Sequence, residues 1–334
     1  MFFIRTIVVT KDDDGKRMDK LLQKTLCNIP DPLLYKLLRT KRIKLCGKKA
    51  EPGTRVQEGD EIQLYISDEF FDDGKKERKA AGFESPRLDL KEEEIVYEDE
   101  NIILIDKPQG ELVHTGDGRE GETTLVDRLC GYLYKKGEYD PTRQNSFAPS
   151  LCNRLDRNTC GIVIAAKNAK SLAILNQKIK DRELHKKYLC VVYGVPEKKS
   201  ATLRDYLYKD QKENRVYIFP SPEDAKRAMH IKYDDDIKTV ITKYEVKKTY
   251  PDKALLEVEL ITGRTHQIRA HLAYIGHPIV GDGKYGVNHK AKTGKAYQML
   301  CSYYLKFDFK TDAGILSYLD GREFFSRFDM STTK

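Results

Sequence analysis

An apolar run at 162–166 constrains the fold of this chain more than any other feature of its sequence. The run, Ile162–Ala166, follows Gly161, and a short polar segment, Asn153–Arg157, lies before the glycine. A polar segment that passes through a glycine into consecutive apolar residues is typical of a loop that feeds a buried strand. We therefore predict a fixed loop-to-strand junction here.

One carboxylate, that of Asp156, lies in this loop between the guanidinium groups of Arg154 and Arg157. Nearby positive charge favours the ionised form of a carboxylate, and an ionised carboxylate that is held in place can act as a nucleophile or a general base. An aspartate between arginines is also common in structural ion pairs and in turns. These residues alone leave both interpretations open.

The longer string around this aspartate is more specific. Residues 154–161 read Arg-Leu-Asp-Arg-x-Thr-x-Gly and lead into an apolar strand that ends in Ala-Lys. This string closely resembles the motif of the RluA-type pseudouridine synthases, which isomerise uridine in RNA. The resemblance implies that Asp156 is the catalytic nucleophile. Asn153 stands where the family often has His, and Cys160 where it often has Ser; neither changes the carboxylate, so we interpret both as tolerated variants.

A second motif lies in a strand that we expect from Lys186 to Gly194. Its two-residue period places Tyr188 on one face with Cys190 and Val192, and a tyrosine in such a strand is most often a core residue. The triplet that ends in Tyr188 also matches the Lys-x-Tyr of the same family. The resemblance implies that Tyr188 packs on the target base and is a candidate for the proton transfer at C5, which suits an aromatic ring beside a flipped base.

The third motif, Gly-Arg-Thr-His-Gln-Ile-Arg at 263–269, matches the family almost completely. The pattern predicts a helix with Thr265 as its N-cap and Gly276 at its end. On the pattern alone, Arg269 is a surface residue near the helix start, whereas the resemblance implies that it pairs with Asp156. The resemblance also assigns substrate binding to four residues: Arg154, Arg264, His266 and, at the base pocket, Ile268.

An earlier turn, Lys107–Gly110, reads Lys-Pro-x-Gly and leads to Val113-His114, which resembles the first motif of the family. The pattern predicts a proline-stiffened turn after two strands, Glu94–Asp99 and Asn101–Asp106. The resemblance implies that this turn supports the floor of the active site.

The next loop, Gly116–Gly121, matches the dinucleotide-binding pattern Gly-x-Gly-x-x-Gly. That pattern indicates a nicotinamide site only where a strand ends directly before it and a helix begins directly after it. Here the strand ends several residues earlier and other motif residues intervene. We therefore reject a nicotinamide site and expect a packing helix that begins near Thr124.

The N-terminal region predicts a small α/β module. Apolar residues recur at helical spacing over Met18–Leu26 and Leu33–Leu38, with a proline-containing break between them. Short strands are expected at Arg42–Leu45 and Glu61–Ile66. The segment 16–66 resembles an S4 domain, a small RNA-binding module that recognises mostly backbone and shape.

A run of basic residues at 36–49 contains no acidic residue. Such a run is commonly just a solvated face, but its place at a helix end and in the following hairpin favours a surface that contacts phosphates. The residues that we assign to RNA binding are Lys36, Arg39, Lys41, Arg42, Lys44, Lys48 and Lys49.

The composition limits the class of protein. Of the 334 residues, 40% are hydrophobic, which is enough for a packed core, and the formal charge of +8 suits a polyanionic partner without requiring one. The seven cysteines form no Cys-x-x-Cys pair, which argues against a zinc ribbon or a disulfide framework. The sequence has no membrane-spanning pattern and no signal-peptide pattern, so we expect a cytoplasmic protein with no membrane partner.

These observations predict an α+β protein in three parts. Residues 16–66 form the S4-like α/β RNA-binding module. Residues 67–90 are charged and lack apolar periodicity, which indicates a flexible linker. Residues 91–334 form the catalytic domain, for which the resemblance implies a large mixed, mainly antiparallel β-sheet flanked by helices and loops.

The resemblance implies a reaction in which Asp156 attacks a flipped uridine, the C–N bond breaks, the base rotates and a C–C bond forms. No redox step or transfer to another molecule occurs, so we expect neither a cofactor nor a metal; His266 and His271 do not stack on one helix face as metal ligands would. The expected partner is large-subunit (23S) ribosomal RNA, with tRNA as the alternative, and the expected state is a monomer. A catalytically inactive RNA-binding assembly factor is the remaining rival.

Overall fold

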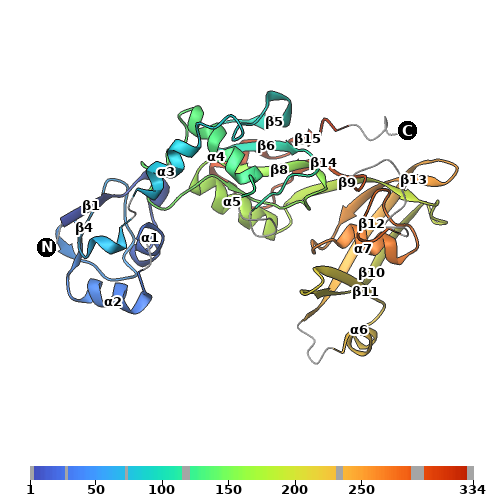
Figure 1. Ribbon diagram of the computed structural model, residues 1–334, viewed down its shortest axis with the longest axis horizontal. Helices are drawn as coiled ribbons and strands as arrows, with labels where there is room; N and C mark the ends of the chain where they lie inside the picture. The colour runs from blue at the N-terminus through green and yellow to red at the C-terminus, as the bar shows by residue number, and fades with distance from the viewer. Residues whose placement is uncertain are drawn as a thin grey trace.

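The computed structural model describes residues 4–26, 29–71, 74–114, 121–230, 236–286 and 297–328 of the chain. Its strands form two sheets, a small one near the N-terminus and a much larger one through the rest of the chain (Figure 1). The end of the large sheet away from the N-terminus carries a lobe with three elements: β10 (Ser200–Asp210), β11 (Arg215–Phe219) and α6 (Pro222–Met229). Within the described residues, no helix is long and apolar enough to cross a membrane.

The small sheet has four strands in the order β1-β4-β2-β3. Leucines of two helices pack on its apolar side chains in one buried core. The predicted helices and strands are confirmed, and the sheet also includes β1, which pairs with β4 upstream of the start expected at residue 16. The bounds are Ile4–Val8 for β1, Met18–Thr25 for α1, Asp31–Arg39 for α2, Ile43–Leu45 for β2, Lys48–Lys49 for β3 and Glu61–Tyr65 for β4.

The segment 67–90 differs from the flexible linker that the sequence predicts. It contains a 3-10 turn, Asp68–Phe70, and helix α3 (Lys75–Gly82). Phe83 is 2% exposed and belongs to the core of the large domain. Leu88 lies so close to the next helix that a Cβ on Gly131 would be 2.2 Å from the Leu88 carbonyl oxygen. These two apolar anchors hold the segment in place although its overall composition is charged.

The large sheet comprises eleven strands among the described residues. Its path is β11-β10-β12-β13-β9-β14-β8-β6-β5, with β7 beside β8 and β15 beside β14. The pairing of β14 with β8 is parallel and the other strand pairs are antiparallel, which confirms the mixed, mainly antiparallel sheet. The remaining bounds are Ile95–Glu98 (β5), Ile102–Lys107 (β6), Ser150–Leu151 (β7), Cys160–Ala166 (β8), Leu184–Tyr193 (β9), Ile237–Thr249 (β12), Lys253–Leu260 (β13), Leu300–Phe307 (β14) and Glu323–Phe325 (β15).

Strand β8 is buried on both faces, which explains its unbroken apolar sequence. Val163 and Ala165 point into a core that includes the apolar side of α4 (Leu125–Lys135). Ile162 and Ile164 point into a second core, which includes α5 (Ala169–Lys180). A sheet covered on both sides gives the loop before β8 a rigid base.

Side chains cap the starts of both covering helices, and α4 begins where the sequence predicts, directly after Thr124. The Thr124 side chain accepts a hydrogen bond from the backbone N–H of Asp127, and that of Asn168 accepts one from Ser171. The loop 116–121, which we rejected as a nicotinamide site, lies outside the described residues except for Gly121.

Gly161 allows β8 to approach β14 closely. Its φ is 108°, and a Cβ at this position would lie 2.2 Å from the Ser302 carbonyl oxygen.

We expect Gly161→Ala to lower the free energy of unfolding by at least about 3 kcal/mol, because the methyl group meets fixed backbone in a conformation that side chains rarely adopt. Chemical denaturation measures the change. Gly137→Ala is the control: Gly137 has a φ of 73° but nothing within 4 Å, so a loss of about 1 kcal/mol is expected, and equal losses would contradict the explanation.

Candidate active site

Asp156 lies in the loop that joins β7 to β8. The Thr159 N–H donates to the Asp156 carbonyl oxygen (3.0 Å), and the Ile164 N–H donates to Asn153 Oδ1 (2.8 Å). Leu155 is buried in the core beneath the loop. The Asp156 side chain is 26% exposed. The loop therefore fixes the backbone of Asp156 while its carboxylate stays accessible.

The Lys107–Gly110 turn supports this loop from behind. The buried Lys107 Nζ donates to the carbonyl oxygens of Pro108 (2.8 Å), Glu111 (2.9 Å) and Arg157 (2.9 Å). The Gly110 N–H donates to the same Arg157 oxygen at 3.0 Å. Burial lowers the pKa of Lys107 to about 8. A single ammonium group thus ties the turn to the residue that follows Asp156.

Arg269 provides the charge partner of Asp156. It lies in α7 (Gln267–Tyr274), and its Nη1 donates to Asp156 Oδ2 at 2.8 Å. Its Nε and Nη2 donate to the two carboxylate oxygens of Asp282, at 2.7 and 3.0 Å. Burial opposes the charge of this guanidinium, but its hydrogen bonds with Asp282 and Asp156 raise the pKa of Arg269 above its usual value.

Asp282 orients Arg269, and its side chain is completely buried. Its Oδ1 also accepts the backbone N–H groups of Lys284 (2.8 Å) and Tyr285 (3.1 Å). Burial alone would raise the pKa of Asp282, but the hydrogen bonds from Arg269 hold it below its usual value. We did not identify Asp282 from the sequence; the one signal available was an aspartate between two glycines at 281–283.

His266 and Tyr285 line the other side of the carboxylate. His266 Nε2 is 4.0 Å from Asp156 Oδ2, and its Nδ1 is 2.9 Å from the Tyr285 hydroxyl. That hydroxyl also accepts the Val216 N–H at 3.0 Å, which connects the site to β11. Burial lowers the pKa of His266 to about 4, and this outweighs the opposite effect of Asp156. His266 is therefore neutral at neutral pH, whereas Arg269 contributes a positive charge in direct contact with Asp156.

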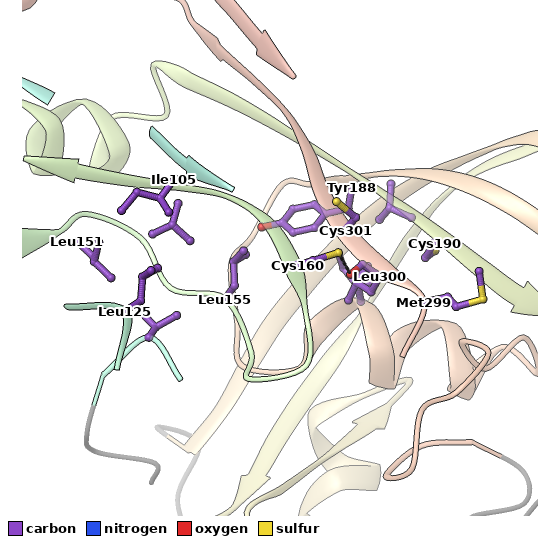
Figure 2. Packing of buried hydrophobic residues seen from close by; sticks show 14 of the residues in the cluster. Ile105, Leu125, Leu151, Leu155, Cys160, Tyr188, Cys190, Met299, Leu300 and Cys301 are labelled. Atoms are coloured by element: carbon purple, nitrogen blue, oxygen red, sulfur yellow. Dashed lines mark hydrogen bonds between the residues drawn. The ribbon is translucent and has the colours of Figure 1, made fainter. Parts of the chain in front are cut away.

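Tyr188 reaches the site from β9 and is 8% exposed. Figure 2 shows its hydroxyl directed toward the loop that carries Leu155. Burial, with a smaller contribution from the charge of Asp156, raises the pKa of Tyr188 to about 12. The phenol is therefore protonated at neutral pH. An accessible carboxylate that is held by a fixed guanidinium is suited to nucleophilic attack on a bound ring.

The other predicted site residues differ in their exposure and in their contacts. Ile268 is 4% exposed and packs in the core that also contains Tyr188. Arg154 and Arg264 are exposed. Arg157 forms its ion pair with Glu122, so the guanidinium that holds Asp156 comes from α7 and not from the next position in the sequence.

The start of α7 corrects one prediction. Thr265 is not its N-cap: the structure places His266 there, with a φ of 52°. The reason is the Gln267 side chain, whose Oε1 accepts the Arg264 N–H (3.1 Å) and the Thr262 hydroxyl (2.9 Å). This amide closes the turn before α7, a task that capping patterns assign to a Ser or Thr.

The basic residues assigned to RNA binding lie together on α2, β2, β3 and the turns between them. Six of the seven are exposed, and Lys44 is half-buried, with its Nζ 5.1 Å from the centre of the Tyr65 ring. Lys49 forms an ion pair with Glu51 at 2.8 Å. These seven basic residues therefore form a largely solvated, positively charged surface, which we call the basic face.

His271, the other histidine that the sequence analysis considered as a metal ligand, lies within α7 and points into the protein core. His271 is buried, with Nδ1 2.9 Å from Thr242 Oγ1 and Nε2 2.8 Å from Asp205 Oδ2. In the part of the chain that the structure describes, no three His, Cys, Asp or Glu residues are grouped so that they could hold a metal ion.

Comparison with known proteins identifies the family. Residues 101–274, which contain Asp156, Tyr188 and Arg269, match the family model described as RNA pseudouridylate synthase. The chain belongs to this family. It is thus a pseudouridine synthase, an isomerase, and the resemblance to the RluA type is confirmed.

Two relatives of this synthase carry the same name, ribosomal large subunit pseudouridine synthase C. The one from Escherichia coli (strain K12) is 27% identical over 283 residues, which cover 85% of this chain and 80% of that protein. The one from Buchnera aphidicola subsp. Baizongia pistaciae (strain Bp) is 29% identical over 282 residues, 84% of this chain and 80% of that protein.

Two solved structures share the fold of the synthase. Human RNA Pseudouridylate Synthase Domain Containing 4 has a TM-score of 0.53 and 19% identity, and covers 76% of this chain and 94% of its own. Human RNA Pseudouridylate Synthase Domain Containing 1 has a TM-score of 0.51 and 22% identity, and covers 67% of this chain and 83% of its own.

Proposed function

We propose that this synthase isomerises one or more uridines of large-subunit ribosomal RNA and that Asp156 is its nucleophile. The observation that carries the proposal is the contact between the accessible Asp156 carboxylate and Arg269, 2.8 Å long and fixed from behind by Asp282. The RNA class rests on the relatives, whose names specify the ribosomal large subunit and which align with most of this chain.

The reaction begins with a uridine that leaves its stack, because a side chain cannot reach a base inside a helix. Asp156 then attacks C6 of the base or C1′ of the ribose, and the N1–C1′ bond breaks. The uracil turns within the pocket, C5 bonds to C1′, and the bond between Asp156 and the substrate breaks, which restores the free carboxylate. The proton on C5 leaves to solvent, and N1 takes up a proton. The product has the atoms of the substrate, so the scheme needs neither a co-substrate nor an oxidant.

Each neighbouring side chain has a role in this scheme. Arg269 orients the Asp156 carboxylate, since its guanidinium is fixed before substrate arrives. Tyr188, whose raised pKa keeps it protonated in the free enzyme, packs on the base, can donate a hydrogen bond and remains a candidate for the proton transfer at C5. Ile268 contacts the base from the apolar side. The substrate-binding roles of Arg154, Arg264 and His266 remain part of the proposal.

The basic face contributes affinity for the RNA without choosing the uridine. Its exposed lysines and arginines can neutralise backbone phosphates, and such contacts position a protein on RNA but do not read its sequence. We therefore assign the S4-like module at 16–66, with β1 before it, to RNA binding and the residues from 91 onward to catalysis. We propose that the enzyme acts as a monomer.

Pseudouridine mapping in RNA from cells that lack the gene tests the substrate. We expect one or more pseudouridines to disappear from large-subunit ribosomal RNA and to return when the purified enzyme is added to that RNA in vitro. Tritium release from C5-labelled uridine measures the same reaction. Loss of pseudouridine from tRNA alone would refute the ribosomal assignment, and no loss in any RNA would favour an inactive RNA-binding factor.

A further inference from the structure

A buried carboxylate lies between the N-terminal module and the catalytic domain. It belongs to Asp13, at the end of the 3-10 turn Lys11–Asp13, and its side chain has no exposed surface. Two partners come from the module itself: Thr10 Oγ1 donates to Oδ2 (2.7 Å) and Lys16 Nζ to Oδ1 (3.0 Å). A charge is seldom buried unless such partners satisfy it.

Two further partners of Asp13 come from the catalytic domain. Asn145 Nδ2 donates to Asp13 Oδ2 (3.1 Å) and to the Val8 carbonyl oxygen (2.7 Å). The Ser146 hydroxyl donates to Asp13 Oδ1 and accepts from Lys16 Nζ at 2.8 Å. Asp13 therefore has all four of these hydrogen bonds only while the loop that carries Asn145 and Ser146 is in contact with the module.

Two other contacts connect the same parts of the chain. Asp12 Oδ1 accepts the backbone N–H of Ala169, the first residue of α5, at 2.8 Å. This carboxylate satisfies one of the N–H groups that every helix start leaves unpaired, where negative charge is favoured. Lys76 Nζ of α3 donates to the Gln144 carbonyl oxygen at 2.6 Å. In Figure 1, α3 lies between the small sheet and α4.

We propose that Asp12, Asp13, Asn145 and Ser146 form a clasp that holds the module in one orientation on the catalytic domain. The clasp sets the separation between the basic face and Asp156, so the enzyme acts best on a folded RNA that presents a target uridine and a second backbone segment at that separation. The RNA part of this inference rests on the proposed function. A fixed pair of binding surfaces binds such an RNA more tightly than a loosely tethered pair, because less freedom is lost on binding.

The test opens the clasp from the catalytic side. Asn145→Ala with Ser146→Ala removes the partners that the loop gives to Asp13 and leaves the module's own contacts intact. Thr142→Ala is the control, because the Thr142 hydroxyl donates only to Asp140 within the same loop (2.7 Å). Small-angle X-ray scattering of the full chain measures its radius of gyration, and hydrogen exchange measures protection of the Ala169 amide.

In the double variant we expect a larger radius of gyration and faster exchange at Ala169, with no change in the control. Activity on a long ribosomal RNA fragment should fall by about tenfold or more, whereas activity on a minimal hairpin with the same uridine should stay within about threefold. Unchanged scattering would overturn the clasp, and equal losses on both RNAs would overturn its role in RNA selection. Scattering and hydrogen exchange test the clasp without any RNA. If the wild-type enzyme showed no activity on either RNA, the proposed function would be refuted, but the evidence for the clasp would be unaffected.

Discussion

Asp156→Asn is expected to reduce pseudouridine formation by on the order of 10⁴-fold or more, because an amide is a far weaker nucleophile than a carboxylate of the same shape. The loss should appear in single-turnover tritium release, which reports the chemistry and not product release. RNA affinity should change little, since phosphate contacts on the basic face supply most of the binding in our proposal.

The structure makes this variant a clean test. Arg269 keeps both of its hydrogen bonds to Asp282 when the charge at 156 is removed, so the fold should remain intact. Thermal denaturation checks this point. A folded Asp156→Asn enzyme that retains more than about one hundredth of the activity would contradict nucleophilic attack by this carboxylate, because the removal of a nucleophile has much larger effects.

Arg269→Met is expected to abolish activity and to destabilise the protein by about 3–5 kcal/mol, because it leaves the completely buried Asp282 carboxylate without its ion pair. Arg269→Lys should also lose most activity, since the three N–H groups of an ammonium share one nitrogen and cannot reproduce the planar guanidinium, whose three nitrogens reach Asp156 and Asp282. Urea denaturation gives the stability, and single-turnover kinetics give the activity.

A second substitution separates the two effects of Arg269. Asp282→Asn, added to Arg269→Met, removes the unpaired charge but keeps an oxygen for the N–H groups of Lys284 and Tyr285. The double variant should recover much of the lost stability and none of the activity. Recovery of activity together with stability would mean that Arg269 serves the fold alone.

Local pattern predicted the elements that carry the candidate site. The loop before β8, the strand with Tyr188 and the helix with Arg269 each carry a contiguous motif, and burial on two faces explains the apolar run at 162–166. The resemblance also predicted that Arg269 meets Asp156, although neither periodicity nor charge specified that contact. These features are recognisable because one element contains the whole signal.

Residues whose role depends on a distant partner were not predicted. Asp282 and Tyr285 lie in a turn without periodicity, and their partners Arg269 and His266 come from another element. Phe83 and Leu88 hold a charged segment in place, but two apolar residues are too few to show as periodicity, so composition indicated a flexible linker. At the start of α7, the Gln267 side chain replaced the expected cap, because it reaches backward to Thr262 and Arg264.

The parallel pairing of β8 with β14 has a consequence for when the enzyme becomes active. Two neighbours of β8 are available early, since β6 and β7 precede it in the chain, but β14, which pairs with the start of β8, comes from Leu300–Phe307. Pairing across so long a sequence separation is slow, and until then the start of β8, next to Asp156, lacks its β14 partner. The site is therefore complete only after β14 has been made and has paired with β8.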